Sequence, residues 1–137
     1  MLALLIWACT QEPASDLPPP VEAAAASHWI EDMWRQRALT VSAGLDEAQQ
    51  MLANEEKDKA AEHVMAVYRG AFEPELEPLI REQVSPQVAV ELEYGFGLMR
   101  EAMLKGNRTQ AKERIEAFNA TLEPAAAHLD ELKAVLR

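Results

Sequence analysis

Apolar positions recur every three or four residues along most of the chain after residue 26, which predicts amphipathic helices. The first predicted helix runs from about Ser27, a suitable N-cap, to about Asn54. The second begins near Lys57 and continues into an acidic, proline-containing stretch at 72–78. The sequence has no sustained alternation of apolar and polar residues and no Asn-Gly or Asp-Gly pair, so no strand is predicted. The positions predicted to face inward are Ile30, Trp34, Val41, Leu45, Ala48 and Leu52, then Ala60, Val64, Val67, Tyr68, Ala71 and Phe72.

Boundary signals divide the second half of the chain into two further helices. Ser85 followed by Pro86 combines an N-cap with a first-turn proline, and this helix extends to about Lys105. Gly106 suits the left-handed position after a helix end, and the last helix begins near Thr109. The fold class expected is all-α: an up-down antiparallel four-helix bundle over 27–137 with an extended N-terminal linker. The inward positions predicted here are Val88, Leu92, Gly95, Leu98, Met99 and Ala102, then Ala111, Ile115, Phe118, Leu122, Ala125, Leu129, Leu132 and Leu136.

The first eight residues read as a leader outside the fold. The apolar run that ends at Cys9 is shorter than the roughly 20 residues that span a bilayer. Ile6-Trp7-Ala8-Cys9 resembles a bacterial lipoprotein box, in which the cysteine is lipidated and becomes the new N-terminus. The alternative is a short apolar tail with an incidental cysteine.

Residues 9–26 have the composition of a tether. Pro13 and the triplet Pro18-Pro19-Pro20 favour extended, polyproline-like backbone. Together with a lipidated Cys9, this segment predicts an envelope lipoprotein on the periplasmic side, attached to the membrane through its lipid.

Charge and composition argue against several classes of function. The chain has 137 residues and a net charge of −10, which argues against binding to nucleic acid phosphates. Its single cysteine excludes internal disulfides. No Ser-His-Asp or Cys-His arrangement and no glycine-rich phosphate loop can be recognised, so an enzyme is not expected.

The stretch FEPELEP at 72–78 is the most unusual feature. Pro74 and Pro78 lack N–H groups and should loosen the helix, while Glu73 and Glu77 bring two carboxylates close together. Such a segment can hold a hard cation through oxygen ligands. Alternatively, it is a solvated corner whose glutamates stabilise a helix N-terminus.

The segments AAEHVMAVYRGAFEPELEPLIRE, at 60–82, and SPQVAVELEYGFGLMREAMLKGN, at 85–107, carry a family likeness. Together they resemble the soluble extracytoplasmic domain of bacterial high-affinity iron permeases, with a similarity that runs from about Ala60 to Leu122. The matching positions are Tyr68, Phe72, Glu73, Leu76, Glu77, Pro78 and Ile80, then Leu92, Glu93, Phe96, Met99 and Arg100.

The resemblance implies an accessory protein that binds iron or assists an iron-uptake complex. It suggests Glu73, Glu77 and Glu93 as carboxylate ligands to one iron between the second and third helices. Tyr68 is a further candidate ligand to ferric iron, although a core tyrosine would fit the same pattern. The permease's own membrane helices, with their Arg-Glu-x-x-Glu motifs, are not in this sequence, so an accessory role is expected rather than transport.

Two other functions remain open. The chain could be a non-catalytic accessory or structural subunit of a membrane protein complex, with Trp29, Met33 and Trp34 as its contact patch. It could also be a haem-binding four-helix bundle, since haem needs an axial histidine or a His/Met pair, and the chain has three histidines and six methionines. Those histidines are His28, His63 and His128.

Overall fold

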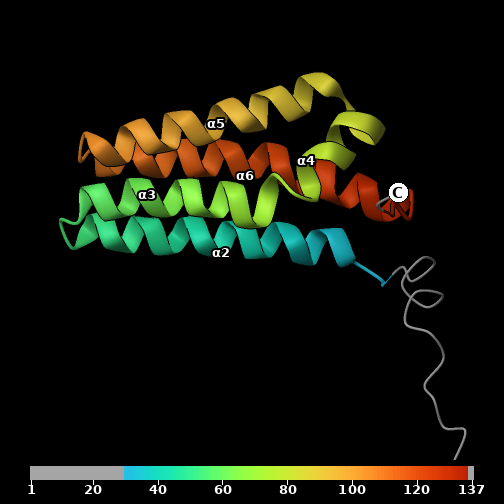
Figure 1. Cartoon of the computed structure of the whole chain (residues 1–137), viewed down its shortest axis with the longest axis horizontal. Coiled ribbons are helices and arrows are strands. Elements are labelled where there is room, and N and C mark those ends of the chain that lie inside the picture. The colour runs from blue at the N-terminus through green and yellow to red at the C-terminus, as the bar shows by residue number, and fades with distance from the viewer. Residues whose placement is uncertain (1–29, 136–137) are drawn as a thin grey trace, which may run out of the picture.

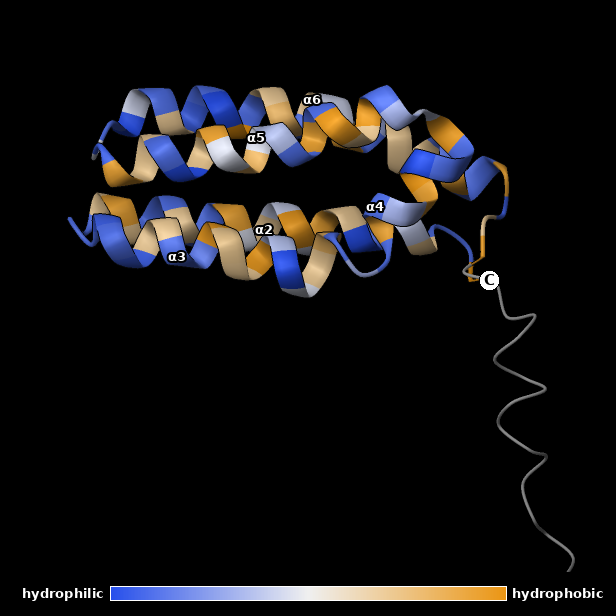
Figure 2. Ribbon diagram, turned by 45° about the horizontal axis from the view of Figure 1, so that its top comes forward, coloured by the Kyte–Doolittle hydropathy of each residue, from blue (hydrophilic) through white to orange (hydrophobic). Residues whose placement is uncertain are grey.

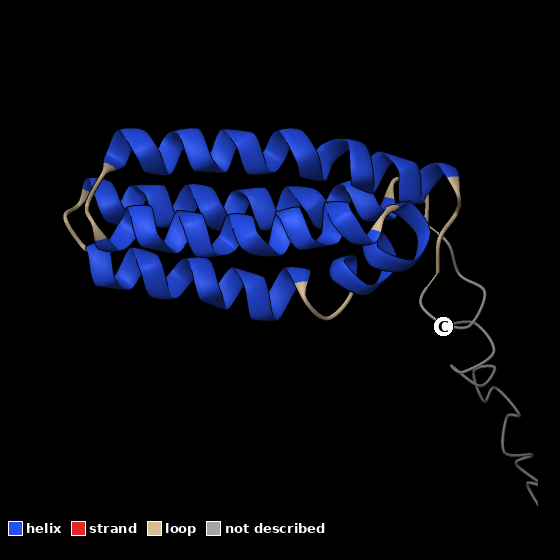
Figure 3. Cartoon of the chain, turned by 90° about the horizontal axis from the view of Figure 1, so that it is seen from above, coloured by secondary structure: helices blue, strands red, loops and turns tan. Residues whose placement is uncertain are grey.

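The computed structural model describes residues 30–135, and this part of the chain is all-α, with no strand between Ile30 and Val135 (Figures 1 and 3). The expected helical bundle is confirmed. It has one short helix, α4, and two π-helical turns, η1 and η2, that the sequence did not predict. The elements are α2 (Met33–Ala53), α3 (Lys57–Val67), η1 (Tyr68–Phe72), α4 (Leu76–Leu79), η2 (Ile80–Val84), α5 (Pro86–Leu104) and α6 (Arg108–Glu131).

The four longer helices pack side by side with consecutive ones running in opposite directions (Figure 1). Helix α2 packs on α3 and α6, and α5 packs on the same two helices, so α2 and α5 occupy opposite corners. The predicted leader 1–8, Cys9, the tether 9–26 and the N-cap Ser27 lie outside the described residues.

Helix boundaries agree with the sequence signals wherever a local cap sets them. The hydroxyl of Ser85 accepts from the N–H groups of Gln87 and Val88, and α5 begins at Pro86 as expected. Gly106 has φ 67°, the left-handed conformation predicted after a helix end. Asn107 then caps α6 by accepting from the N–H of Gln110.

The prediction is wrong for two positions at the ends of the apolar faces. Ile30 and Leu132 were expected to face inward, but both are about half exposed. Ile30 precedes α2, which begins at Met33, so it lacks the helical geometry that its register assumed. Leu132 is the C-cap of α6, where the helix ends. Leu136 lies outside the described residues.

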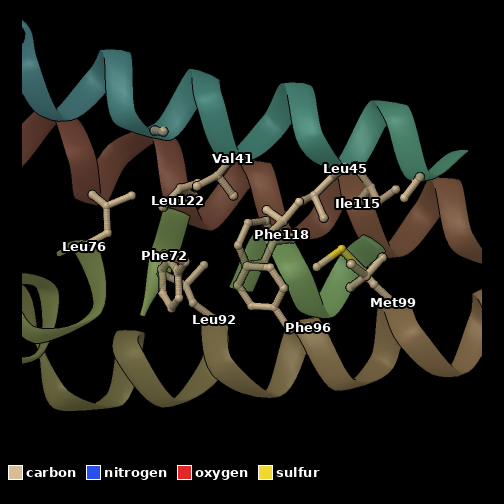
Figure 4. Close-up of a cluster of buried hydrophobic side chains, with 14 of the residues drawn as sticks. Val41, Leu45, Phe72, Leu76, Leu92, Phe96, Met99, Ile115, Phe118 and Leu122 are labelled. Carbon is tan, nitrogen blue, oxygen red and sulfur yellow. The ribbon is translucent and has the colours of Figure 1, made fainter. Parts of the chain in front are cut away.

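Aromatic rings fill the middle of the bundle (Figure 4). The ring centroids of Phe72 and Phe96 are 5.2 Å apart, and those of Phe96 and Phe118 are 4.7 Å apart. Phe96 and Met103 are fully buried, although neither was among the positions of their helix predicted to face inward. Figure 2 shows the result as apolar residues on the facing sides of the helices and polar residues outside.

A carboxylate from the end of α6 caps the start of α2. Asp130 is the one buried charged side chain in the part of the chain that the structure describes. Its two oxygens accept from the backbone N–H groups of Trp34, at 2.9 Å, and Arg35, at 3.0 Å. The local N-cap residue, Asp32, makes no such bond with its side chain. Because the first N–H groups of a helix have no partner within it, Asp130 supplies the cap that α2 lacks locally.

Candidate functional site

The acidic stretch forms an irregular corner between α3 and α5, as the prolines predicted. The N–H of Glu73 bonds the carbonyl of Tyr68 at 2.8 Å, a π-helical bond that closes η1. A turn at 73–75 leads into the single turn of α4, and the N–H of Ser85 then bonds the carbonyl of Ile80 at 2.9 Å to close η2. Pro74 and Pro78 cannot donate to a helical ladder, which explains why regular helix is interrupted here.

This corner brings a phenol, two carboxylates and a guanidinium together. The hydroxyl of Tyr68 donates to Oε2 of Glu77 at 3.3 Å. Nη2 of Arg81 lies 2.6 Å from Oε1 of Glu77 and 3.7 Å from Oε2 of Glu93. We call these four residues, from η1, α4, η2 and α5, the Tyr68 corner.

The Tyr68 corner lies at the boundary between core and solvent. The ring of Tyr68 packs against Phe96, with centroids 5.1 Å apart, while its hydroxyl faces the carboxylates. The side chain of Glu77 is only 14% exposed, whereas that of Glu93 is 50% exposed. The corner is therefore anchored on the core side and open to a solute on the other.

Burial raises the pKa of Tyr68 to about 12, with help from the negative charges of Glu77, Glu93 and Glu73. The phenol is therefore neutral at physiological pH and acts as a hydrogen-bond donor. A cation that took the phenol oxygen as a phenolate ligand would have to displace its proton.

The three glutamates predicted as ligands do not gather into one site. Glu73 is exposed in the turn after η1, and only its charge acts on Tyr68. Between Ile30 and Val135, no three His, Cys, Asp or Glu side chains are grouped so that they could hold a metal. Arg81, which the sequence reasoning missed, stands between Glu77 and Glu93. The spacing of Glu77 and Arg81, four residues apart on a helical segment, was the signal that could have found it.

The predicted contact patch is wrong for Trp34. Its side chain is 1% exposed, and its indole N–H donates to the carbonyl of Ala134 at 2.7 Å. A tryptophan in this position belongs to the core and cannot meet a partner. Met33 is partly buried against the same core, and Trp29 lies outside the described residues.

The described histidines lie away from the aromatic centre. Nε2 of His63, on α3, is 3.0 Å from Oε2 of Glu47 on α2, and His128 is exposed near the end of α6. His28 lies outside the described residues.

None of the helices between Ile30 and Val135 has the length and apolar character needed to cross a membrane. Comparison of the chain with protein-family models, with curated proteins and with solved structures gives no match. The resemblance to the iron-permease domain therefore stays a prediction.

Proposed function

We propose that this chain is a non-enzymatic envelope lipoprotein, anchored through Cys9, whose helical bundle binds iron at the Tyr68 corner. The observation that supports this role best is that Glu77 and Glu93 both approach the guanidinium of Arg81, while the hydroxyl of Tyr68 bonds Glu77. Three different elements supply these oxygen atoms. A phenol and carboxylates are hard oxygen donors, the kind that suits a hard cation such as ferric iron.

Iron would have to displace Arg81 from the carboxylates in order to bind. Its guanidinium already neutralises Glu77 and approaches Glu93, so iron and Arg81 would compete for the same carboxylates. The Arg81 side chain, half exposed, can swing into solvent without disturbing the core. Iron binding at this corner is therefore an exchange of one cation for another.

Proton release gives the proposed site a pH dependence. With the pKa of Tyr68 raised to about 12, a metal that takes the phenolate oxygen must release the phenol's proton. Affinity for ferric iron should therefore increase as the pH rises toward that value. Binding through the carboxylates alone would lack this dependence in neutral and alkaline solution.

Removing Arg81 should strengthen iron binding, whereas removing Glu77 should weaken it. In calorimetric titrations with chelated ferric iron, we expect Arg81→Gln to raise the affinity about tenfold because a competing cation is lost. Glu77→Gln should lower it by at least as much. Tyr68→Phe should remove the visible absorption of a ferric phenolate.

Arg37→Gln is the matched control, because Arg37 makes a comparable ion pair with Glu75, 2.7 Å long, that involves no tyrosine. It should leave the affinity unchanged. Equal iron binding by the wild type, Arg81→Gln and Glu77→Gln would contradict the proposed site.

A second candidate function is that of an accessory subunit in a membrane complex. A surface groove of about 470 Å³ between α2 and α6 favours it, with the exposed Leu39 on its wall. Its lining is mainly small and apolar, including Ala38, Ala120 and Pro124. Solubilised membranes should then yield a stoichiometric partner, which Leu39→Glu would release while Leu132→Glu, at another exposed apolar position, would not.

A further inference from the structure

A surface depression of about 250 Å³ lies between α3 and α5, next to the Tyr68 corner. Two arginines from different elements line it, Arg69 from η1 and Arg100 from α5. Neither guanidinium forms an ion pair or a hydrogen bond with any other residue that the structure describes. Because the chain has 23 acidic residues and only 13 lysines and arginines, two arginines without a carboxylate partner at one depression suggest a ligand. The arginines that do have an ion pair or a hydrogen bond include Arg35, Arg37, Arg81 and Arg108.

The charges of the depression are separated along the helices. On α3 and η1 its lining begins with Asp58 and Glu62 and ends with Arg69, on one face at steps of three or four residues. Helix α5 runs opposite to α3 (Figure 1), so Arg100 lies toward the Arg69 end and Leu104 toward the Asp58 end. The depression therefore has an acidic end near the α2–α3 loop and a basic end near the Tyr68 corner.

The acidic end lacks partners as the basic end does. The carboxylates of Asp58 and Glu62 make no ion pair and no hydrogen bond within residues 30–135. Between the two ends the lining is apolar and consists of Ala61, Met65 and Leu104. A molecule that fits this lining has a negative charge at one end, a positive charge at the other and an apolar middle.

We propose that the depression binds a short zwitterionic peptide, with its carboxylate on Arg69 and Arg100 and its ammonium group at the acidic end. Arginine holds carboxylates through two parallel hydrogen bonds. Glu62 and Arg69 are about 10 Å apart along the helix axis, and an extended tripeptide spans about the same length. Such a ligand is neutral overall, so the chain's net charge of −10 does not repel it. No residue of the Tyr68 corner lines the depression, so the proposal does not depend on iron binding.

Blocked peptides test whether both charges are recognised. In calorimetric titrations of the full chain, tri-alanine should bind measurably. N-acetylation removes its ammonium charge and C-terminal amidation removes its carboxylate, so each blocked form should bind at least tenfold more weakly. Absence of tri-alanine binding would overturn the proposal. So would an acetylated peptide that binds as tightly as tri-alanine, because the depression would then be a simple anion site.

Substitutions test which residues hold each end of the peptide. Arg69→Gln and Arg100→Gln should each weaken tri-alanine binding about tenfold but leave the amidated peptide unaffected, because that peptide has no carboxylate. Glu62→Gln should weaken tri-alanine binding and leave the acetylated peptide unaffected. All three side chains are exposed, so these variants should fold.

Arg114→Gln is the matched control, because Arg114 lies on α6 and lines a different depression. It should leave tri-alanine binding unchanged. Equal losses for Arg114→Gln and Arg69→Gln would mean that only the overall charge matters, which would overturn the proposal. Equal weakening of the free and the amidated peptide by Arg69→Gln would overturn it too, since Arg69 would then not contact the carboxylate.

Discussion

Replacing Asp130 by asparagine should lower the free energy of unfolding by about 1.5–3 kcal/mol, the range for hydrogen bonds to a charged group. The carboxylate accepts from two backbone N–H groups at the start of α2, at 2.9 and 3.0 Å. An asparagine can offer its oxygen to one of them but must turn its NH₂ toward the other. A buried donor is then left without a partner.

Urea unfolding followed by circular dichroism measures this effect. Asp32→Asn is the matched control, because it makes the same chemical change at the local N-cap position, where the side chain makes no capping bond. We expect that control to cost less than about 0.5 kcal/mol, as exposed substitutions usually do. Equal losses for the two variants would show that Asp130 does not act as the cap of α2.

Truncating Phe96 should cost more than any surface change, about 3–5 kcal/mol for Phe96→Ala. Its ring is fully buried and contacts the rings of Tyr68, Phe72 and Phe118. Its removal both loses apolar burial and leaves a cavity between η1, α5 and α6. The same unfolding measurement gives the value.

Leu39→Ala is the control for Phe96→Ala, since Leu39 is an exposed apolar residue on a helix of the same bundle. It should change stability by less than about 0.5 kcal/mol. If Phe96→Ala lost under about 1 kcal/mol, the aromatic cluster would not be the centre of the core.

Local patterns predicted most of the fold. Period and capping placed the four longer helices, because those signals act over a few residues, although α2 begins at Met33 and not near Ser27 as predicted. Ser85 and Gly106, for example, fix their own helix ends. The π-helical turns were not predicted, because prolines indicate an interruption but not which hydrogen bonds replace the regular ones. Trp34 was predicted both to face inward and to contact a partner, and only the first prediction is confirmed, because periodicity marks an apolar face without saying whether the core or a partner covers it.

At the candidate site too, the residue types could be predicted from the sequence but their arrangement could not. The sequence indicated Tyr68, Glu73, Glu77 and Glu93 as ligands. In the structure Tyr68 bonds Glu77 and Arg81 approaches both Glu77 and Glu93, whereas Glu73 is exposed in the turn after η1. The sequence could not show that Arg81 would stand between the two carboxylates, because that depends on how α4 and η2 turn toward α5. The cap supplied by Asp130 could not be predicted either, since Asp130 lies 96 positions after Trp34 in the sequence.

The Asp130 cap also determines how the domain would bear mechanical load. Any pull from the residues before Ile30 enters the fold at the start of α2, where Asp130 and the Trp34–Ala134 bond join that helix to the end of the chain. Force is thus shared at once between the first and the last long helix.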